Sequence, residues 1–112
     1  MKKTIAIDFD GPIHKYSKGW QDGKIYDEPV EGALEAMAEL YHKGYEIVIF
    51  TTREDIREVD YWIDKQCDKC FAVTSEQREL KYEVTNKKPP AIAYIDDRGI
   101  RFTNWKDMLN YF

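Results

Sequence analysis

Three short apolar segments that end abruptly in polar residues constrain the fold of this chain most. Residues 4–7, 45–50 and 92–95 are rich in isoleucine, valine, alanine and aromatic side chains. They lack the strict alternation of a half-exposed strand, so each predicts a buried strand. The residues that follow these strands are Asp8, Thr51 and Asp96.

Helical patterns alternate with the predicted strands. After Pro29, apolar residues recur at helical spacing until Gly44, the expected left-handed cap; they are Ala33, Met37, Leu40 and Tyr41. Glu54 and Asp55 suit the first turn of a second helix, whose apolar positions are Ile56, Val59 and Ile63, and residues 105–109 indicate a closing helix. This alternation predicts an α/β fold: a three-layer, Rossmann-like domain with a central parallel sheet.

Two stretches have weaker patterns. Residues 12–29 contain turn signals at Gly19 and Gly23 and predict a short hairpin flap after the first strand. Between residues 67 and 83 the pattern is ambiguous, with candidate short strands at 71–73 and 82–84.

Length and charge narrow the class of protein. The 112 residues, 43% of them hydrophobic, fit one domain. No apolar run approaches the roughly 20 residues that a membrane-spanning helix needs. The first residues resemble the start of a secretory signal peptide, but Asp8 interrupts their apolar stretch. We therefore expect a cytoplasmic protein without a membrane partner. The net charge of −4 disfavours an extended nucleic-acid-binding surface.

Cys67 and Cys70 are expected to be free thiols, because two ligands alone do not make a zinc site. Nothing in the sequence indicates the oligomeric state.

The first candidate site residues follow the first predicted strand. Asp8 and Asp10 are two residues apart, and Gly11 lacks a side chain that would keep a ligand from the backbone amides. Ligands of parallel sheets bind beyond the carboxyl ends of the strands, where two carboxylates suit a hard cation. The competing interpretation is structural, since aspartate is common in turns.

The other candidates lie further along the chain. Asp96 and Asp97 are adjacent carboxylates that repel each other unless a cation or Lys88 lies beside them. Taken singly, Thr51 is as readily explained as a hydroxyl that caps a helix, and Lys88 as a solvated charge.

Together these residues carry a resemblance to a known family. Four segments resemble, in order, the four motifs of the haloacid dehalogenase superfamily of phosphotransferases: Asp8-Phe9-Asp10-Gly11, Thr51-Thr52-Arg53, Lys88-Pro89 and Asp96-Asp97. The resemblance spans most of the chain. No second domain separates the motifs, so the chain resembles members without a cap domain. Pro12 departs from the family pattern and removes one backbone amide from the loop after the first motif.

The resemblance implies a role for each residue. Asp8 would be the nucleophile that becomes an aspartyl-phosphate, and Asp10 the general acid and base. The implied catalytic residues are Asp8, Asp10, Thr51 and Lys88; the implied phosphate-binding residues are Gly11, Thr51, Thr52 and Lys88; the implied magnesium ligands are Asp8, Asp10, Asp96 and Asp97.

The expected function is therefore a Mg²⁺-dependent phosphohydrolase that acts on a small phosphate monoester. Aromatic and lysine side chains in the flap favour a nucleotide or a nucleic-acid end as substrate, although Trp20 could equally pack on the first helix. Two alternatives stay open. One is a catalytically quiet module that binds metal and phosphate; the other is a receiver-like phosphoacceptor domain, which the order of the acidic motifs disfavours.

Overall fold

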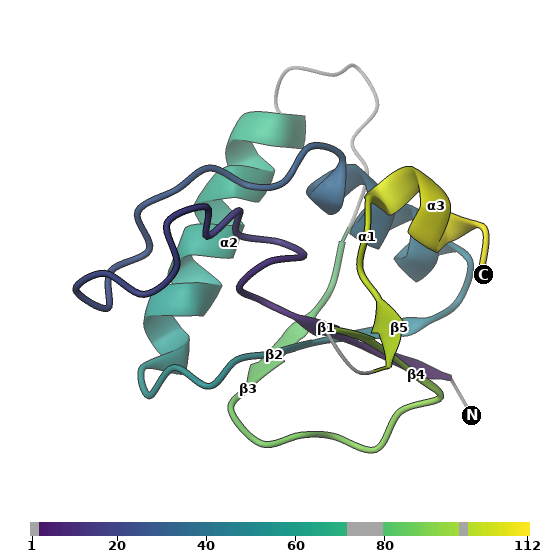
Figure 1. Ribbon diagram of the computed structural model, residues 1–112. Helices are drawn as coiled ribbons and strands as arrows, with labels where there is room; N and C mark the ends of the chain where they lie inside the picture. Colours follow the sequence, from purple (N-terminus) through teal and green to yellow (C-terminus); the bar gives the residue numbers. More distant parts are fainter. Residues whose placement is uncertain (1–2, 72–79, 97–98) are drawn as a thin grey trace.

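A computed structural model describes residues 3–71, 80–96 and 99–112 of the chain. Five parallel strands form one sheet in the order β3-β2-β1-β4-β5 (Figure 1). In chain order the elements are β1 (Thr4–Asp8), α1 (Ala33–His42), β2 (Glu46–Phe50), α2 (Ile56–Phe71), β3 (Glu83–Thr85), β4 (Ala93–Asp96), β5 (Ile100–Arg101) and α3 (Trp105–Leu109). The predicted α/β class and parallel sheet are confirmed. β5 is an element that the sequence did not predict.

The hydrophobic core lies between the sheet and the helices. Alternate residues of the central strands point into it, and all are completely or almost completely buried: Ile5, Ile7, Ile47, Ile49 and Ile95. The intervening residues Ala6 and Val48 are also buried, on the opposite face of the sheet. Burial on both faces explains why these strands are continuously apolar rather than alternating.

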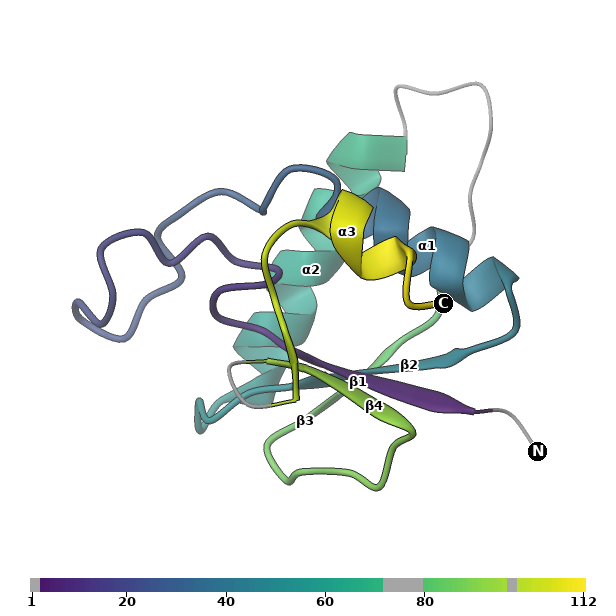
Figure 2. The ribbon, with the colours of Figure 1, turned by 45° about the vertical axis from the view of Figure 1, so that its right-hand side comes forward.

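The three helices lie on one side of the sheet, as the two views agree (Figures 1 and 2). α1 packs against both α2 and α3, which places all three in one layer. The opposite side is crossed by residues 86–92, where the Tyr94 hydroxyl donates to the Pro89 carbonyl at 2.6 Å and accepts from the Ala91 N–H at 3.1 Å. The expected third layer is therefore absent from the described residues. The connection from β3 to β4 contains two consecutive prolines and is too short for a covering helix.

Helix ends follow the predicted signals. Gly44, just after α1, has φ +100°, the left-handed conformation expected of its cap. α3 has the predicted bounds, and the Asn104 side chain accepts from the Asp107 N–H at its start. Its Trp105 is buried and donates from Nε1 to the Pro12 carbonyl at 2.9 Å, which ties α3 to the turn after β1. None of the described helices has the length and apolar character that crossing a membrane requires.

Residues 12–29, here called the flap, form an irregular loop rather than the expected hairpin of two strands. Its two arms run side by side, joined by the Lys15 N–H donating to the Glu28 carbonyl at 3.0 Å and by Ser17 donating to Asp27. The backbone pairing is limited to an isolated antiparallel bridge between His14 and Pro29, so the segment contains no regular strand. The flap extends beyond the carboxyl ends of the strands, at the left of Figure 1.

Candidate active site at the carboxyl edge of the sheet

Asp8 and Asp96 end neighbouring strands at the same level. β1 and β4 pair in parallel with Ile7 opposite Ile95, so the two aspartates are the next residues on strands about 4.8 Å apart. Both are half-buried. Residues in register on neighbouring strands share a face, so both carboxylates belong to the face opposite the core isoleucines.

Lys88 approaches Asp96 from the connection before β4. Its Nζ lies 3.9 Å from Asp96 Oδ2 and 4.6 Å from the centroid of the Tyr94 ring. The other Asp96 oxygen, Oδ1, accepts from the Gly99 N–H at 2.6 Å. Folding thus places the lysine of the third motif beside the acidic residue of the fourth. Asp97, also named as a metal ligand, lies outside the described residues.

Thr51 is buried where the chain leaves β2. Its backbone N–H donates to the Thr85 carbonyl at 3.0 Å, and its Oγ1 accepts from the Arg53 N–H at 3.1 Å. The hydroxyl therefore closes the turn before α2, while its own proton can still be donated to a ligand. Thr52 is exposed and lines a cavity beside this turn.

Asp10 is engaged by two residues to which the sequence analysis gave no role. Arg53 donates to it as a fork, from Nε to Oδ2 at 3.0 Å and from Nη2 to Oδ1 at 3.0 Å. His14 lies 2.8 Å away, with Nδ1 directed at Oδ1. Two signals could have pointed to these contacts: an arginine within the second motif, and a histidine four residues after Asp10.

The turn after β1 uses Gly11 differently from the expectation. Gly11 has φ +108°, a conformation that favours glycine. Its N–H donates to the His14 carbonyl at 2.8 Å, so in this structure the amide stabilises the turn instead of facing a phosphate.

The structure brings together only part of the predicted metal set. Among the described residues, no group of three or more histidine, cysteine, aspartate or glutamate side chains lies close enough to hold a metal ion. Asp8 and Asp96 are level on adjacent strands, whereas the Asp10 oxygens face Arg53 and His14. We therefore leave Asp10 out of the metal set.

A cavity of about 430 Å³ opens between the flap and the start of α2. It is lined by Asp10, Tyr16, Trp20, Gly23, Thr52, Arg53, Glu54, Asp55 and Glu58. Trp20 is 68% exposed and lies over Gly23, where an added Cβ would come within 3.1 Å of the indole. Trp20 thus packs within the flap, and the alternative that it packs on the first helix is wrong.

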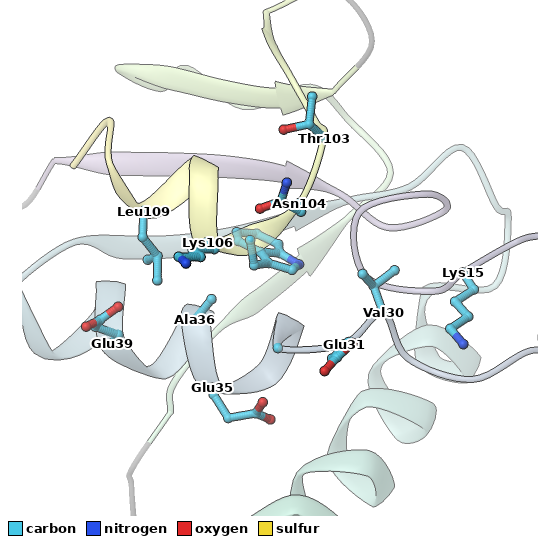
Figure 3. A pocket seen from close by; sticks show the side chains of 12 residues that line it. Lys15, Val30, Glu31, Glu35, Ala36, Glu39, Thr103, Asn104, Lys106 and Leu109 are labelled. Carbon is cyan, nitrogen blue, oxygen red and sulfur yellow. The ribbon is translucent and has the colours of Figure 1, made fainter.

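A second cavity, of about 670 Å³, lies between α1 and α3 (Figure 3). Its lining includes Ala36 and Glu39 of α1 on one side and Asn104 and Lys106 on the other. It contains none of the predicted site residues, whereas the smaller cavity is lined by two of them, Asp10 and Thr52.

The two cysteines lie on α2 as free thiols, as expected. Burial, with the nearby Asp64 carboxylate, raises the pKa of Cys67 to about 11. Burial and the Glu35 carboxylate, which accepts from Cys70 Sγ at 2.7 Å, raise the pKa of Cys70 to about 12. Both thiols are therefore protonated at neutral pH, and the thiolate needed for nucleophilic chemistry is scarce.

Comparison of the chain with protein-family models, with curated proteins and with solved structures gave no significant match.

Proposed function

We propose that this chain is a Mg²⁺-dependent phosphohydrolase of the haloacid dehalogenase type, with Asp8 as its nucleophile. One observation carries the proposal. Asp8 and Asp96 lie level on neighbouring parallel strands, with the Lys88 ammonium 3.9 Å from Asp96, at the sheet edge where ligands of parallel sheets bind. The Thr51 hydroxyl, at the end of the other neighbour of β1, completes a set of groups suited to a phosphoryl group.

Asp8 would act in two displacements. Its carboxylate oxygen forms a bond to phosphorus while the bond from phosphorus to the leaving oxygen breaks, and the leaving oxygen takes the electron pair together with a proton from Asp10. Water then attacks phosphorus and gives a proton to Asp10 as the aspartyl-phosphate bond breaks. Inorganic phosphate leaves, and the Asp8 carboxylate is restored.

Thr51 and Lys88 would stabilise the charge on the transferring group. The Thr51 hydroxyl can donate to a phosphoryl oxygen, and the Lys88 ammonium neutralises negative charge. Lys88 is more than half exposed, so it can turn from Asp96 toward a bound phosphate.

The donor set at this edge fits magnesium. Mg²⁺ in phosphoryl-transfer sites is held by one or two carboxylates and keeps several waters, and Asp8 with Asp96 supplies two carboxylates from rigid strands. When bound, the ion neutralises phosphate oxygens and favours attack by an anionic nucleophile.

The cavity beside Asp10 supports a small monoester with a planar leaving group. Tyr16 and Trp20 offer aromatic faces there. The same lining includes Glu54, Asp55 and Glu58, but none of the flap lysines, and Lys15 pairs instead with Glu28 at 3.4 Å. Among the expected substrates, this charge distribution favours an aryl or nucleoside monophosphate over a nucleic-acid end, whose further phosphates the carboxylates would repel.

A binding module without turnover is the second candidate, because both Asp10 oxygens are engaged by donors. A general acid must reach the leaving oxygen. For Asp10 this requires Arg53 to break one of its two hydrogen bonds to the carboxylate. A dianionic phosphoryl group is an alternative acceptor for that guanidinium.

Phosphate release from a panel of esters separates the two candidates. The panel contains p-nitrophenyl phosphate, nucleoside monophosphates and glycerol phosphate, each with and without Mg²⁺. We expect Mg²⁺-dependent release, fastest with the aromatic esters. Binding of phosphate with no release from any ester would favour the module.

A further inference from the structure

We propose that Asp10, Arg53 and His14 form one hydrogen-bonded network that links the Gly23 and Asp27 positions of the flap to the candidate site. These three residues are called the Asp10 network below. Arg53 and His14 are positioning residues: they orient Asp10 and fix the flap. The consequence for catalysis rests on the proposed function, whereas attachment of the flap does not.

The first branch of the Asp10 network runs through Arg53. Besides its fork to Asp10, Arg53 donates from Nη1 to the Gly23 carbonyl at 2.7 Å, near the tip of the flap. The guanidinium is only 10% exposed and Asp10 only 20%, so this ion pair is shielded from solvent far more than an ordinary surface pair. Thr51 holds the Arg53 backbone through its Oγ1, which anchors this branch to the end of β2.

The second branch runs through His14, and its hydrogen bonds determine the tautomer. The Asp27 backbone N–H, which can only donate, points at His14 Nε2 at 3.0 Å, so Nε2 is the acceptor. The proton is therefore on Nδ1 and is donated to Asp10 Oδ1. His14 acts as a neutral bridge between Asp10 and the returning arm of the flap.

The surroundings of His14 keep the ring in this orientation. It is completely buried, stacked on Phe9 with centroids 5.5 Å apart, and contacted edge-on by Tyr26 and Trp62 at 5.3 and 5.6 Å. Trp62 belongs to α2, so the second branch is also packed against a helix. The ring cannot turn without disrupting this aromatic cluster.

Both arms of the flap are thus linked to the Asp10 network. Gly23 is attached through Arg53, and Asp27 through His14. Replacement of Arg53 should release the flap and disorient Asp10 together. Because one guanidinium bonds both Asp10 and Gly23, the orientation of Asp10 and the position of the flap are coupled.

Tryptic cleavage within the flap measures its attachment without reference to activity. Lys18 and Lys24 are exposed flap residues, and Lys24 is 80% exposed. Arg53→Lys keeps the positive charge, but a lysine cannot make the two hydrogen bonds to Asp10 and the hydrogen bond to the Gly23 carbonyl at the same time. The matched control is Arg57→Lys, at a side chain that is 93% exposed and outside the network. Both substitutions keep a trypsin site.

We expect Arg53→Lys to speed cleavage after Lys18 or Lys24 by roughly tenfold or more, because charged hydrogen bonds are lost, with Arg57→Lys unchanged from wild type. Circular dichroism of each variant checks that the domain is folded. Equal cleavage rates in a folded Arg53→Lys and the control would overturn the proposal, whatever the enzyme activity.

His14 is tested by a pair of variants. Asparagine places an amide N–H near the position of Nδ1 and keeps the bond to Asp10, whereas glutamine places its amide near Nε2 and loses that bond. We expect both to speed cleavage, because each loses one link. If the wild type is a phosphatase, His14→Gln should reduce kcat for poor leaving groups more than His14→Asn does. Equal kcat losses in the two variants would contradict the positioning role.

The outcomes separate the two proposals. Faster cleavage in Arg53→Lys together with a wild type that releases no phosphate leaves the flap attachment standing and refutes the phosphatase. Phosphate release by the wild type, with unchanged tryptic cleavage in Arg53→Lys, supports the phosphatase and refutes the proposed attachment of the flap.

Discussion

Asp8 and Asp96 are the residues that follow the paired Ile7 and Ile95 on two adjacent parallel strands. Two carboxylates placed side by side in this way repel each other unless positive charge is near. Lys88 supplies one charge from the face crossed by residues 86–92. Adjacent carboxylates of this kind suit a site that binds a cation.

Replacing Asp96 tests the proposed metal pair. Asp96→Asn keeps an oxygen that can accept from the Gly99 N–H, so the fold should persist. Loss of one anionic ligand should raise the Mg²⁺ concentration for half-maximal phosphate release by roughly tenfold or more. Asp22→Asn, at an exposed flap residue outside the cavity lining, serves as the control. An unchanged Mg²⁺ requirement in Asp96→Asn would contradict the assignment.

Trp20 is expected to bind the leaving group. Trp20→Ala should raise KM for aryl phosphates by about threefold to tenfold, as loss of an aromatic stack predicts, and leave KM for glycerol phosphate unchanged. Steady-state kinetics on both ester classes measure the difference. Tyr111→Ala removes another exposed aromatic ring and should alter neither value. Equal effects of Trp20→Ala on the two classes would leave the flap with a purely structural role.

Asp27 joins the arms of the flap in a pH-dependent way. Hydrogen bonds from the Ser17 hydroxyl and from backbone amides lower the pKa of Asp27 from 3.8 to about 2. A lowered pKa means that these bonds contribute full stability above pH 3.8 and lose it as the pH falls through about 2. Ser17→Ala should move the NMR titration midpoint of Asp27 up toward 3.8, whereas Thr103→Ala, elsewhere on the surface, should not. A wild-type midpoint near 3.8 would contradict this account.

Much of the fold could be predicted because burial leaves a strong signal in short strands. Residues 4–7 and 92–95 each precede the aspartate that ends the observed strand, and the predicted closing helix has the bounds of α3. The third layer was predicted from the alternation of strands and helices, but the connection from β3 to β4 is too short for a helix that would cover the second face. β5 has only two residues, too few for any periodicity to be detected.

The candidate site was predicted less completely. The positions of Asp8, Thr51 and Asp96 follow from parallel topology, which brings strand ends to one edge. The partners of Asp10 depend on the path of the flap, which returns His14 and Gly23 to the carboxyl edge through irregular backbone. Side-chain pairs such as Arg53 with Asp10, 43 residues apart, leave no local pattern in a single sequence.

The α2 thiols should react slowly with alkylating reagents. A pKa of about 11 for Cys67, against an ordinary 9.0, reduces its thiolate at pH 8 by roughly a hundredfold. Because the Glu35 carboxylate helps to raise the pKa of Cys70, Glu35→Gln should speed alkylation of Cys70 but not of Cys67, as mass spectrometry of each peptide would measure. Glu39→Gln, one helical turn away, should change neither rate. Rapid alkylation of both wild-type thiols would refute the protonated state.

Covalent phosphate on Asp8 is the central claim, and acid quenching during turnover tests it most directly. The protein is mixed with p-nitrophenyl phosphate and Mg²⁺, quenched within milliseconds and digested, and its peptides are searched by mass spectrometry for an added phosphoryl group. We predict an acid-stable, base-labile phosphoryl group on Asp8 in the wild type. Asp8→Asn should show neither label nor phosphate release, with an unchanged circular dichroism spectrum, because the amide is nearly isosteric but cannot attack phosphorus. Undiminished phosphate release by folded Asp8→Asn would contradict the account.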